Sequence, residues 1–99
     1  MANHLKFATL KWDFTNTSTA QASAKIEIVP ILDCWEEVNG KQFRDMVTII
    51  IDADHLKGQT EVKLRELTAK CFKWRTVITT PGCTTETIWK YHSFLPKKQ

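Results

Sequence analysis

The sequence has only three glycines among its 99 residues, and each of them stands alone. Phosphate-binding loops need several glycines close together, so this scarcity excludes a nucleotide-binding loop of that kind. Long apolar runs are also missing, because the longest, residues 46–51, is far too short to span a bilayer. The first residues lack the apolar stretch of a signal peptide. We therefore expect a cytoplasmic protein that makes no membrane contact.

Cysteines at metal-binding spacing are absent as well. The three cysteines, at positions 34, 71 and 83, are odd in number and widely spaced, with no Cys-x-x-Cys pair. This pattern gives little support to a disulfide framework or a zinc site, and it fits a reduced, intracellular environment. Cys83 has no histidine or aspartate placed near it by the pattern, so no activated nucleophile is recognisable. We expect a protein that is not an enzyme and has no cofactor.

What the chain does have is an uneven distribution of charge. The formal net charge is +3. Residues 1–55 carry five Lys or Arg against eight Asp or Glu, whereas residues 56–99 carry nine against three. Such a split is typical of a polar interaction surface or a nucleic-acid footprint. A solvated surface with unevenly spread charge explains it equally well.

Alternating apolar residues predict strands within one domain that spans residues 1–99. In residues 5–14, the side chains of Ala8, Leu10 and Trp12 fall on one side of such a strand. Residues 15–24 are almost entirely small and polar, which predicts a flexible loop. The basic tail at 96–99 is expected to fray.

Two dipeptides predict hairpin turns. Asn39-Gly40 favours a type I′ turn between strands at 25–38 and 41–51, because both central residues of that turn need positive φ. This turn places Pro30 opposite Ile49. Pro81-Gly82 predicts a second turn, which places Thr80 opposite Cys83 and Trp74 opposite Trp89.

The segment between the hairpins decides the fold class. Thr60 as an N-cap, followed by apolar residues at helical spacing, predicts a helix over residues 59–70. The element order is then β-β-β-α-β-β, which matches a small, partly closed, five-stranded OB-like barrel of mostly β, α+β class. An antiparallel sheet with one helix on a face is the alternative. If the segment is instead a strand, the fold becomes an all-β sandwich.

The first hairpin has apolar residues on both faces, and the second face must therefore be covered. The first strand or the helix could cover it, and so could a partner chain. Tryptophan, methionine and arginine are enriched at the centres of interfaces. The predicted protein-interface residues are Val29, Ile31, Trp35, Arg44, Met46 and Ile50. Trp35 and Arg44 fall opposite each other in this register and could stack as a cation–π pair.

The last hairpin carries clustered basic residues next to aromatic ones, a combination that can bind single-stranded nucleic acid. The candidate nucleic-acid-binding residues are Lys73, Arg75, Lys90 and His92. The predicted register turns the neighbouring aromatic rings inward, and the second and third strands are acidic, which weakens this interpretation.

The sequence Asp52-x-Asp54-His55 has hard-metal ligands in a turn. No fourth ligand is recognisably spaced, and acidic turns are common for turn formation alone. We therefore expect no metal site here.

These patterns predict a small non-enzymatic binding protein that acts through protein–protein contacts, as an assembly subunit, an adaptor or an inhibitor. Its partner would be another protein or a second copy of itself, because oppositely charged halves favour association. The alternative is a single-stranded nucleic-acid-binding protein that uses the basic face of the last hairpin.

Overall fold

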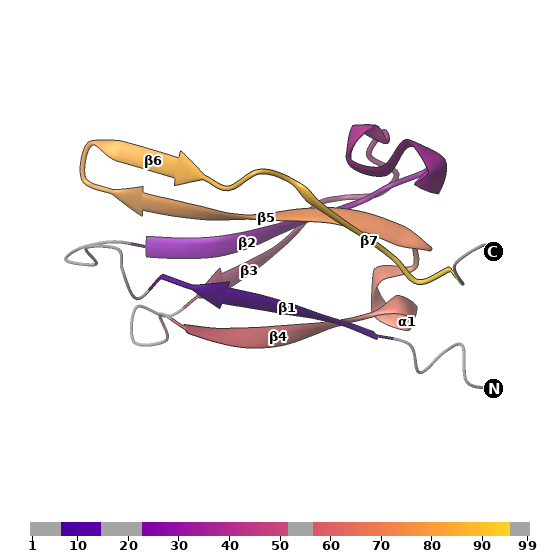
Figure 1. The fold of residues 1–99 in the computed structure, drawn as a ribbon, viewed down its shortest axis with the longest axis horizontal. Helices are drawn as coiled ribbons and strands as arrows, with labels where there is room; N and C mark the ends of the chain where they lie inside the picture. The colour runs from indigo at the N-terminus through magenta and orange to yellow at the C-terminus, as the bar shows by residue number, and fades with distance from the viewer. Residues whose placement is uncertain (1–6, 15–22, 52–56, 96–99) are drawn as a thin grey trace.

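The computed structural model describes residues 7–14, 23–51 and 57–95, and in these ranges the chain forms two antiparallel sheets in two layers (Figure 1). One sheet pairs β1 with β4, and the other has the order β3-β2-β5, with β6 and β7 both lying along the far edge of β5. The strands are β1 (Phe7–Asp13), β2 (Ser23–Pro30), β3 (Val47–Ile51), β4 (Lys57–Lys63), β5 (Cys71–Thr80), β6 (Cys83–Glu86) and β7 (Lys90–Ser93). The described strands do not form a closed barrel, and the antiparallel-sheet alternative fits instead.

The predicted helix at 59–70 is mostly a strand. Residues 57–63 form β4, and a single helical turn, α1 (Leu64–Leu67), follows it. Thr60 does not cap a helix but pairs with Leu10 of β1. The reason is a period of two, because Val62 is buried while its neighbours Glu61 and Lys63 are exposed. The described part of the chain has no helix long and apolar enough to cross a membrane.

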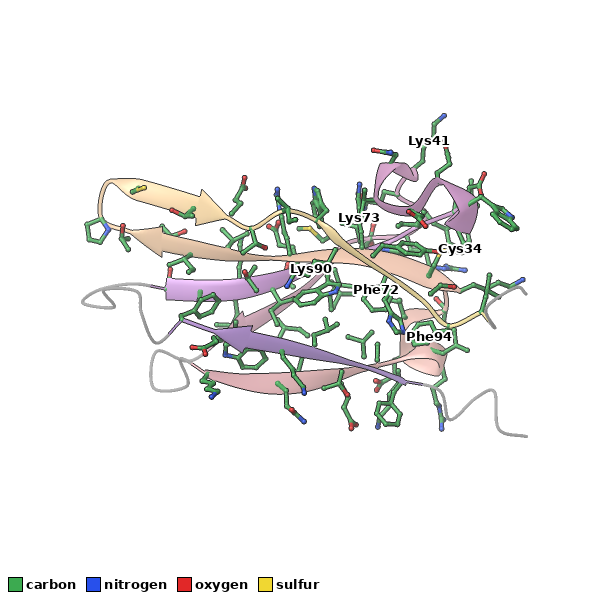
Figure 2. All side chains as sticks on the ribbon, in the orientation of Figure 1. Cys34, Lys41, Phe72, Lys73, Lys90 and Phe94 are labelled. Atoms are coloured by element: carbon green, nitrogen blue, oxygen red, sulfur yellow. A yellow bond between two sulfur atoms is a disulfide. The ribbon has the colours of Figure 1, made fainter. Side chains whose placement is uncertain are left out.

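The core lies between the two layers. The predicted alternation of β1 is confirmed, since Ala8 and Leu10 are 3% and 2% exposed and the intervening residues are exposed. From the larger sheet, β2 and β5 send Ile28 and Trp74 inward as a cross-strand pair. Phe72 is completely buried between the layers (Figure 2). Burying one such side chain stabilises the fold by about 1.5–3 kcal/mol.

The predicted type I′ turn at Asn39-Gly40 is wrong. Residues 31–46 instead form a long connection between β2 and β3, which contains the 3-10 helix η2 (Cys34–Asn39). Gly40 has φ −67°, so it does not supply a positive φ. A glycine is required at this position because a Cβ atom there would collide with the Cγ2 atom of Ile31.

The register of β2 with β3 changes accordingly. Ile49 lies opposite Ile26 rather than opposite Pro30, a shift of four residues. Because side chains alternate with a period of two, an even shift leaves every residue of β3 on its predicted face. Ile49 and Ile51 therefore still pack against the core.

The last hairpin begins in the predicted register and then departs from it. Thr80 lies opposite Cys83 and Val77 opposite Glu86, but Trp74 lies opposite Lys90 rather than Trp89. Two residues of β5 therefore face the three residues 87–89, which is a β-bulge. The side chain of Thr87 accepts a hydrogen bond from the backbone N–H of Thr76 (3.0 Å) at this point.

Cys34 and Cys71 form a disulfide, contrary to the expectation that the cysteines are unpaired. The two residues are 37 positions apart in the sequence, yet their Cα atoms are 5.9 Å apart. The bond joins the start of η2 to the first residue of β5. Cys83 is unpaired and exposed.

Candidate protein-binding surface

The connection between β2 and β3 exposes four large apolar side chains, which we call the connection surface. They are Leu32 (63% exposed), Trp35 (78%), Phe43 (44%) and Met46 (42%). Exposed single apolar residues are ordinary, but four within one connection form an unusual concentration. This segment is therefore the strongest candidate for a binding surface.

The connection is held against the larger sheet on the face opposite β1 and β4 (Figure 1). The hydroxyl of Tyr91 donates a hydrogen bond to the carbonyl oxygen of Cys34 at 2.9 Å, and the Lys73 ammonium donates to that of Val38 at 3.1 Å. The backbone N–H of Phe43 donates to the carbonyl of Pro30 at 2.8 Å. These contacts and the disulfide fix the connection at several points along its length.

The start of η2 has its own local support. Asp33 is the N-cap, and its carboxylate accepts a hydrogen bond from the backbone N–H of Trp35 at 2.9 Å. Capping of this kind satisfies a donor that a short helix leaves unpaired. The backbone at the exposed indole is therefore fixed by its neighbour.

The predicted interface residues separate into two groups. Trp35, Arg44 and Met46 are exposed on the connection, as expected for contact residues. Val29 and Ile31 are 5% and 2% exposed, so their assignment to an interface is corrected: both belong to the interior. They are buried because β2 ends at Pro30 and the connection, with η2, lies over this end of the sheet.

Two other predicted contacts also change. Arg44 lies over the ring of Phe43 at 4.8 Å from the ring centroid, and not in the predicted pairing with Trp35. Ile50 is 72% exposed but lies on β3, opposite Lys25, away from the connection itself.

The sequence interpretation missed two members of the connection surface. The continuous hairpin predicted from Asn39-Gly40 would place Leu32 and Phe43 on its core face, opposite to Trp35, but both are exposed. The proline at position 30, which cannot donate to a ladder, was the signal that the strand ends there. A strand that ends at Pro30 no longer fixes the face of the residues that follow.

The bulge divides the predicted basic cluster between two faces of the sheet. Lys73 and Arg75 lie on the face that carries η2, whereas Lys90 pairs with Trp74 and His92 pairs with Phe72 on the face toward the core. Figure 2 shows Lys73 pointing toward η2 and Lys90 lying on the side of β1. The predicted single basic face of these four residues is therefore wrong.

Arg75 is engaged inside the protein. Its guanidinium bonds to the Glu27 carboxylate at 2.8 Å and to Glu86 at 3.2 Å, and it lies 4.3 Å from the ring centroid of Trp89. Burial by itself raises the pKa of the Glu27 carboxyl, but the hydrogen bond and charge of Arg75, with Lys25 nearby, outweigh it and hold that pKa below its usual value. This arginine stabilises the sheet and has little capacity left for a phosphate.

His92 is packed between two rings. Its ring centroid lies 5.4 Å from that of Phe72 and 5.2 Å from that of Phe94. Burial lowers the pKa of His92, because a charged imidazolium is poorly solvated among these rings. The residue is therefore a neutral part of the core edge at physiological pH.

An open depression of about 570 Å³ lies between β1, β4 and β7. It is lined by Lys11, Trp12, Asp13, Lys57, Gly58, Gln59 and Lys90. A Cβ atom at Gly58 would press on the ring of Trp12, so the glycine makes room for the indole. Lys11, Lys57 and Lys90 line this depression together with the Trp12 indole.

Residues Asp52, Asp54 and His55 lie outside the described ranges. Within residues 7–14, 23–51 and 57–95, no cluster of three or more His, Cys, Asp or Glu could hold a metal ion.

Comparisons with protein-family models, curated proteins and solved structures found no match for this chain. The connection surface remains the best-defined candidate.

Proposed function

We propose that this chain is a small non-enzymatic protein that binds a protein partner through the connection surface. The observation that carries the proposal is Trp35, an indole 78% exposed on a connection that a disulfide ties to the sheet. Tryptophan is among the residues that dominate the energetics of protein interfaces. Its burial by a partner would remove a large apolar area from water.

Pre-organisation supports the same function. A loop that orders only on binding loses conformational entropy, and this loss weakens the complex. Here the disulfide, the Tyr91 hydroxyl and the Lys73 ammonium already fix the loop backbone. A partner would therefore meet a surface that has little ordering cost.

The charges around the connection surface indicate the chemistry of the partner. Four carboxylates and two basic side chains lie in the connection: Asp33, Glu36, Glu37, Asp45, Lys41 and Arg44. An acidic rim favours a partner whose apolar centre is surrounded by basic residues. An adaptor, an inhibitor and an assembly subunit could each use such a surface.

Single-stranded nucleic acid is the less supported ligand. Of the four predicted basic residues, Arg75 is engaged in ion pairs and Lys73 in a hydrogen bond within the protein. The bulge places the other two, Lys90 and His92, on the opposite face of the sheet from them. A nucleic-acid function predicts affinity that falls steeply with salt and falls further in Lys73→Gln. Binding that does not depend on salt would exclude it.

The disulfide also bears on the expected cytoplasmic location. Disulfides persist in oxidising compartments and are rare in the cytosol, so the pair of Cys34 and Cys71 favours an oxidising compartment instead. Alkylation of the protein in denaturant, which exposes the buried Cys71, before and after reduction tests this choice. A cytosolic protein would be alkylated at all three cysteines without reduction, whereas an oxidised one would be alkylated at Cys83 alone.

The experiment that tests the proposed function is quantitative affinity capture from the source cells with a matched set of variants. Trp35→Ser/Met46→Ser removes two of the four side chains of the connection surface, and Ile88→Ser removes a side chain elsewhere that is as exposed as Trp35. We expect the double variant to lose a partner that wild type and Ile88→Ser retain, with circular dichroism unchanged in all three. Equal capture by all three proteins would contradict the proposal.

A further inference from the structure

The larger sheet ends at β3 on one side, and this edge has an unusual composition. β3 pairs with β2 and with no other described strand. Its five residues are Val47, Thr48, Ile49, Ile50 and Ile51, all uncharged and β-branched. An edge strand presents unpaired backbone N–H and C=O groups and is a template for another strand. β3 therefore has the composition of a strand that pairs on both sides.

The other edges of the described sheets are protected in ways that β3 is not. Both strands of the smaller sheet carry charged residues, such as Lys11 on β1 and Glu61 on β4. The opposite edge of the larger sheet carries Glu86 and Lys90 and is interrupted by the bulge at 87–89. Charges and bulges are the common means by which proteins prevent edge pairing. Among the described strands, β3 alone has no charged residue.

We propose that a second copy of this chain pairs with β3 in antiparallel orientation, so that the two larger sheets join across a two-fold axis. A two-fold axis at Ile49 places Ile49 opposite itself, Thr48 opposite Ile50 and Val47 opposite Ile51. Only uncharged residues meet in this register. An antiparallel strand pair is self-complementary about such an axis, as a symmetric dimer requires.

The charges on the neighbouring strand fit the same arrangement. On the outer face Lys25 is the neighbour of Ile50, and Glu27 is the neighbour of Thr48. In the dimer, each row across the joined strands would therefore run from Lys25 of one copy to Glu27 of the other. Like charges are not neighbours in either row, and each Glu27 is already paired with Arg75 of its own copy. The side chain of Ile50, now 72% exposed, would contact the second copy's Thr48.

This association is expected to be weak. Pairing through five residues buries less area than the roughly 1,200–2,000 Å² typical of stable interfaces. We therefore expect dissociation constants of roughly tens to hundreds of micromolar. The inference goes beyond the proposed function, because it uses the β3 edge rather than the connection surface.

Sedimentation-velocity ultracentrifugation from about 5 to about 500 µM, a range that spans the expected dissociation constant, tests the proposal. All proteins would carry Cys83→Ser, which prevents dimers linked by that thiol. Ile50→Lys places a charge on the β3 edge, and Ile88→Lys is its matched control, because Ile88 is 80% exposed beside the opposite edge. Circular dichroism would check that each variant is folded.

The proposal predicts that wild type and Ile88→Lys dimerise with rising concentration, whereas Ile50→Lys needs at least about tenfold higher concentration. Trp35→Ser should dimerise like wild type, which separates this result from the test of the proposed function. A wild type that stays monomeric throughout would overturn the proposal. Equal dimerisation by Ile50→Lys would also overturn it. If Ile50→Lys instead lost a different protein in the capture experiment, β3 would bind that protein and the two-fold dimer would be wrong.

Discussion

Cys34 and Cys71 form a disulfide that joins the start of η2 to the first residue of β5. The bond lies beside the Tyr91 hydroxyl contact, which reaches the carbonyl of Cys34 from β7. Three segments far apart in the sequence are therefore tied together at one end of the larger sheet. The position of the connection surface depends on this junction.

Removal of the disulfide should lower stability and release the connection. In a Cys83→Ser background, Cys34→Ser/Cys71→Ser should lower the free energy of unfolding by about 2–4 kcal/mol, because the bond closes a loop of 37 residues in the unfolded chain. Urea denaturation followed by tryptophan fluorescence measures the change. Cys83→Ser alone is the control and should match wild type, since Cys83 is exposed and unpaired. Identical midpoints for all three proteins would show that the bond does not form.

Replacement of the buried carboxylate on β2 should also destabilise the sheet. Glu27→Gln removes the charge that pairs with Arg75 and Lys25, and we expect a loss of about 1–3 kcal/mol at neutral pH. Glu86→Gln is the control and should cost less than about 1 kcal/mol, because that side chain is half exposed.

The same pair should respond to acid. Because the pKa of Glu27 is lowered in the folded protein, its stabilising contribution is complete above the usual value of 4.5 and declines as the pH falls through the lowered value. The difference in stability between wild type and Glu27→Gln should therefore shrink in that range. A difference that stays constant down to low pH would contradict the account of this pair.

His92 should contribute a second pH dependence with its own range. Burial lowers its pKa in the folded protein, so the unfolded chain takes up a proton first, near the usual value of 6.5. The free energy of unfolding should then fall as the pH decreases from above 6.5 toward the lowered value. In His92→Phe this part of the decline should be absent, which thermal denaturation at several pH values would detect. An unchanged pH profile in the variant would place the effect on other groups.

The close approach at Gly40 gives a prediction that separates the observed connection from the predicted hairpin. Gly40→Ala should destabilise the protein by about 1–3 kcal/mol, because its Cβ atom would collide with Ile31. The exposed neighbour Asn39 does not have a positive φ, so Asn39→Ala should change stability by less than about 0.5 kcal/mol. A type I′ turn would instead make both substitutions costly.

The sequence predicted the local features of the fold better than the distant ones. The alternation in β1 was confirmed, because the alternating apolar residues of a strand with one buried face are sufficient to predict which side chains point to the core. The start of the last hairpin was also confirmed, since Pro81-Gly82 fixes the pairs nearest the turn. Both predictions depend on residues that are close together in the chain.

Predictions that depended on distant contacts were wrong for identifiable reasons. A glycine at position 40 favoured the prediction of a turn, but this glycine is needed because the Ile31 side chain occupies the space of a Cβ atom. The bulge at 87–89 inserts one residue without a glycine or proline to indicate it, and this moves Trp89 to the opposite face of the sheet. The disulfide has no short spacing motif, so only the three-dimensional proximity of Cys34 and Cys71 reveals it.

The candidate site was predicted in part. The predicted hairpin places Trp35, Arg44 and Met46 on its outer face, their residue types support a contact role, and they are exposed. Val29 and Ile31 were assigned to the same surface by strand parity, which fails because the chain beyond Pro30 lies over this end of the sheet. Residue type was thus a better guide to exposure here than parity was.

The most direct test of binding through the connection surface is site-specific photocrosslinking in the source cells. A photoreactive phenylalanine analogue would replace Phe43 in one protein, which leaves Trp35 intact, and Ile88 in another; both positions are exposed. We predict a discrete protein adduct from position 43 and none from position 88. No adduct at position 43, or the same adducts from both positions, would contradict the account.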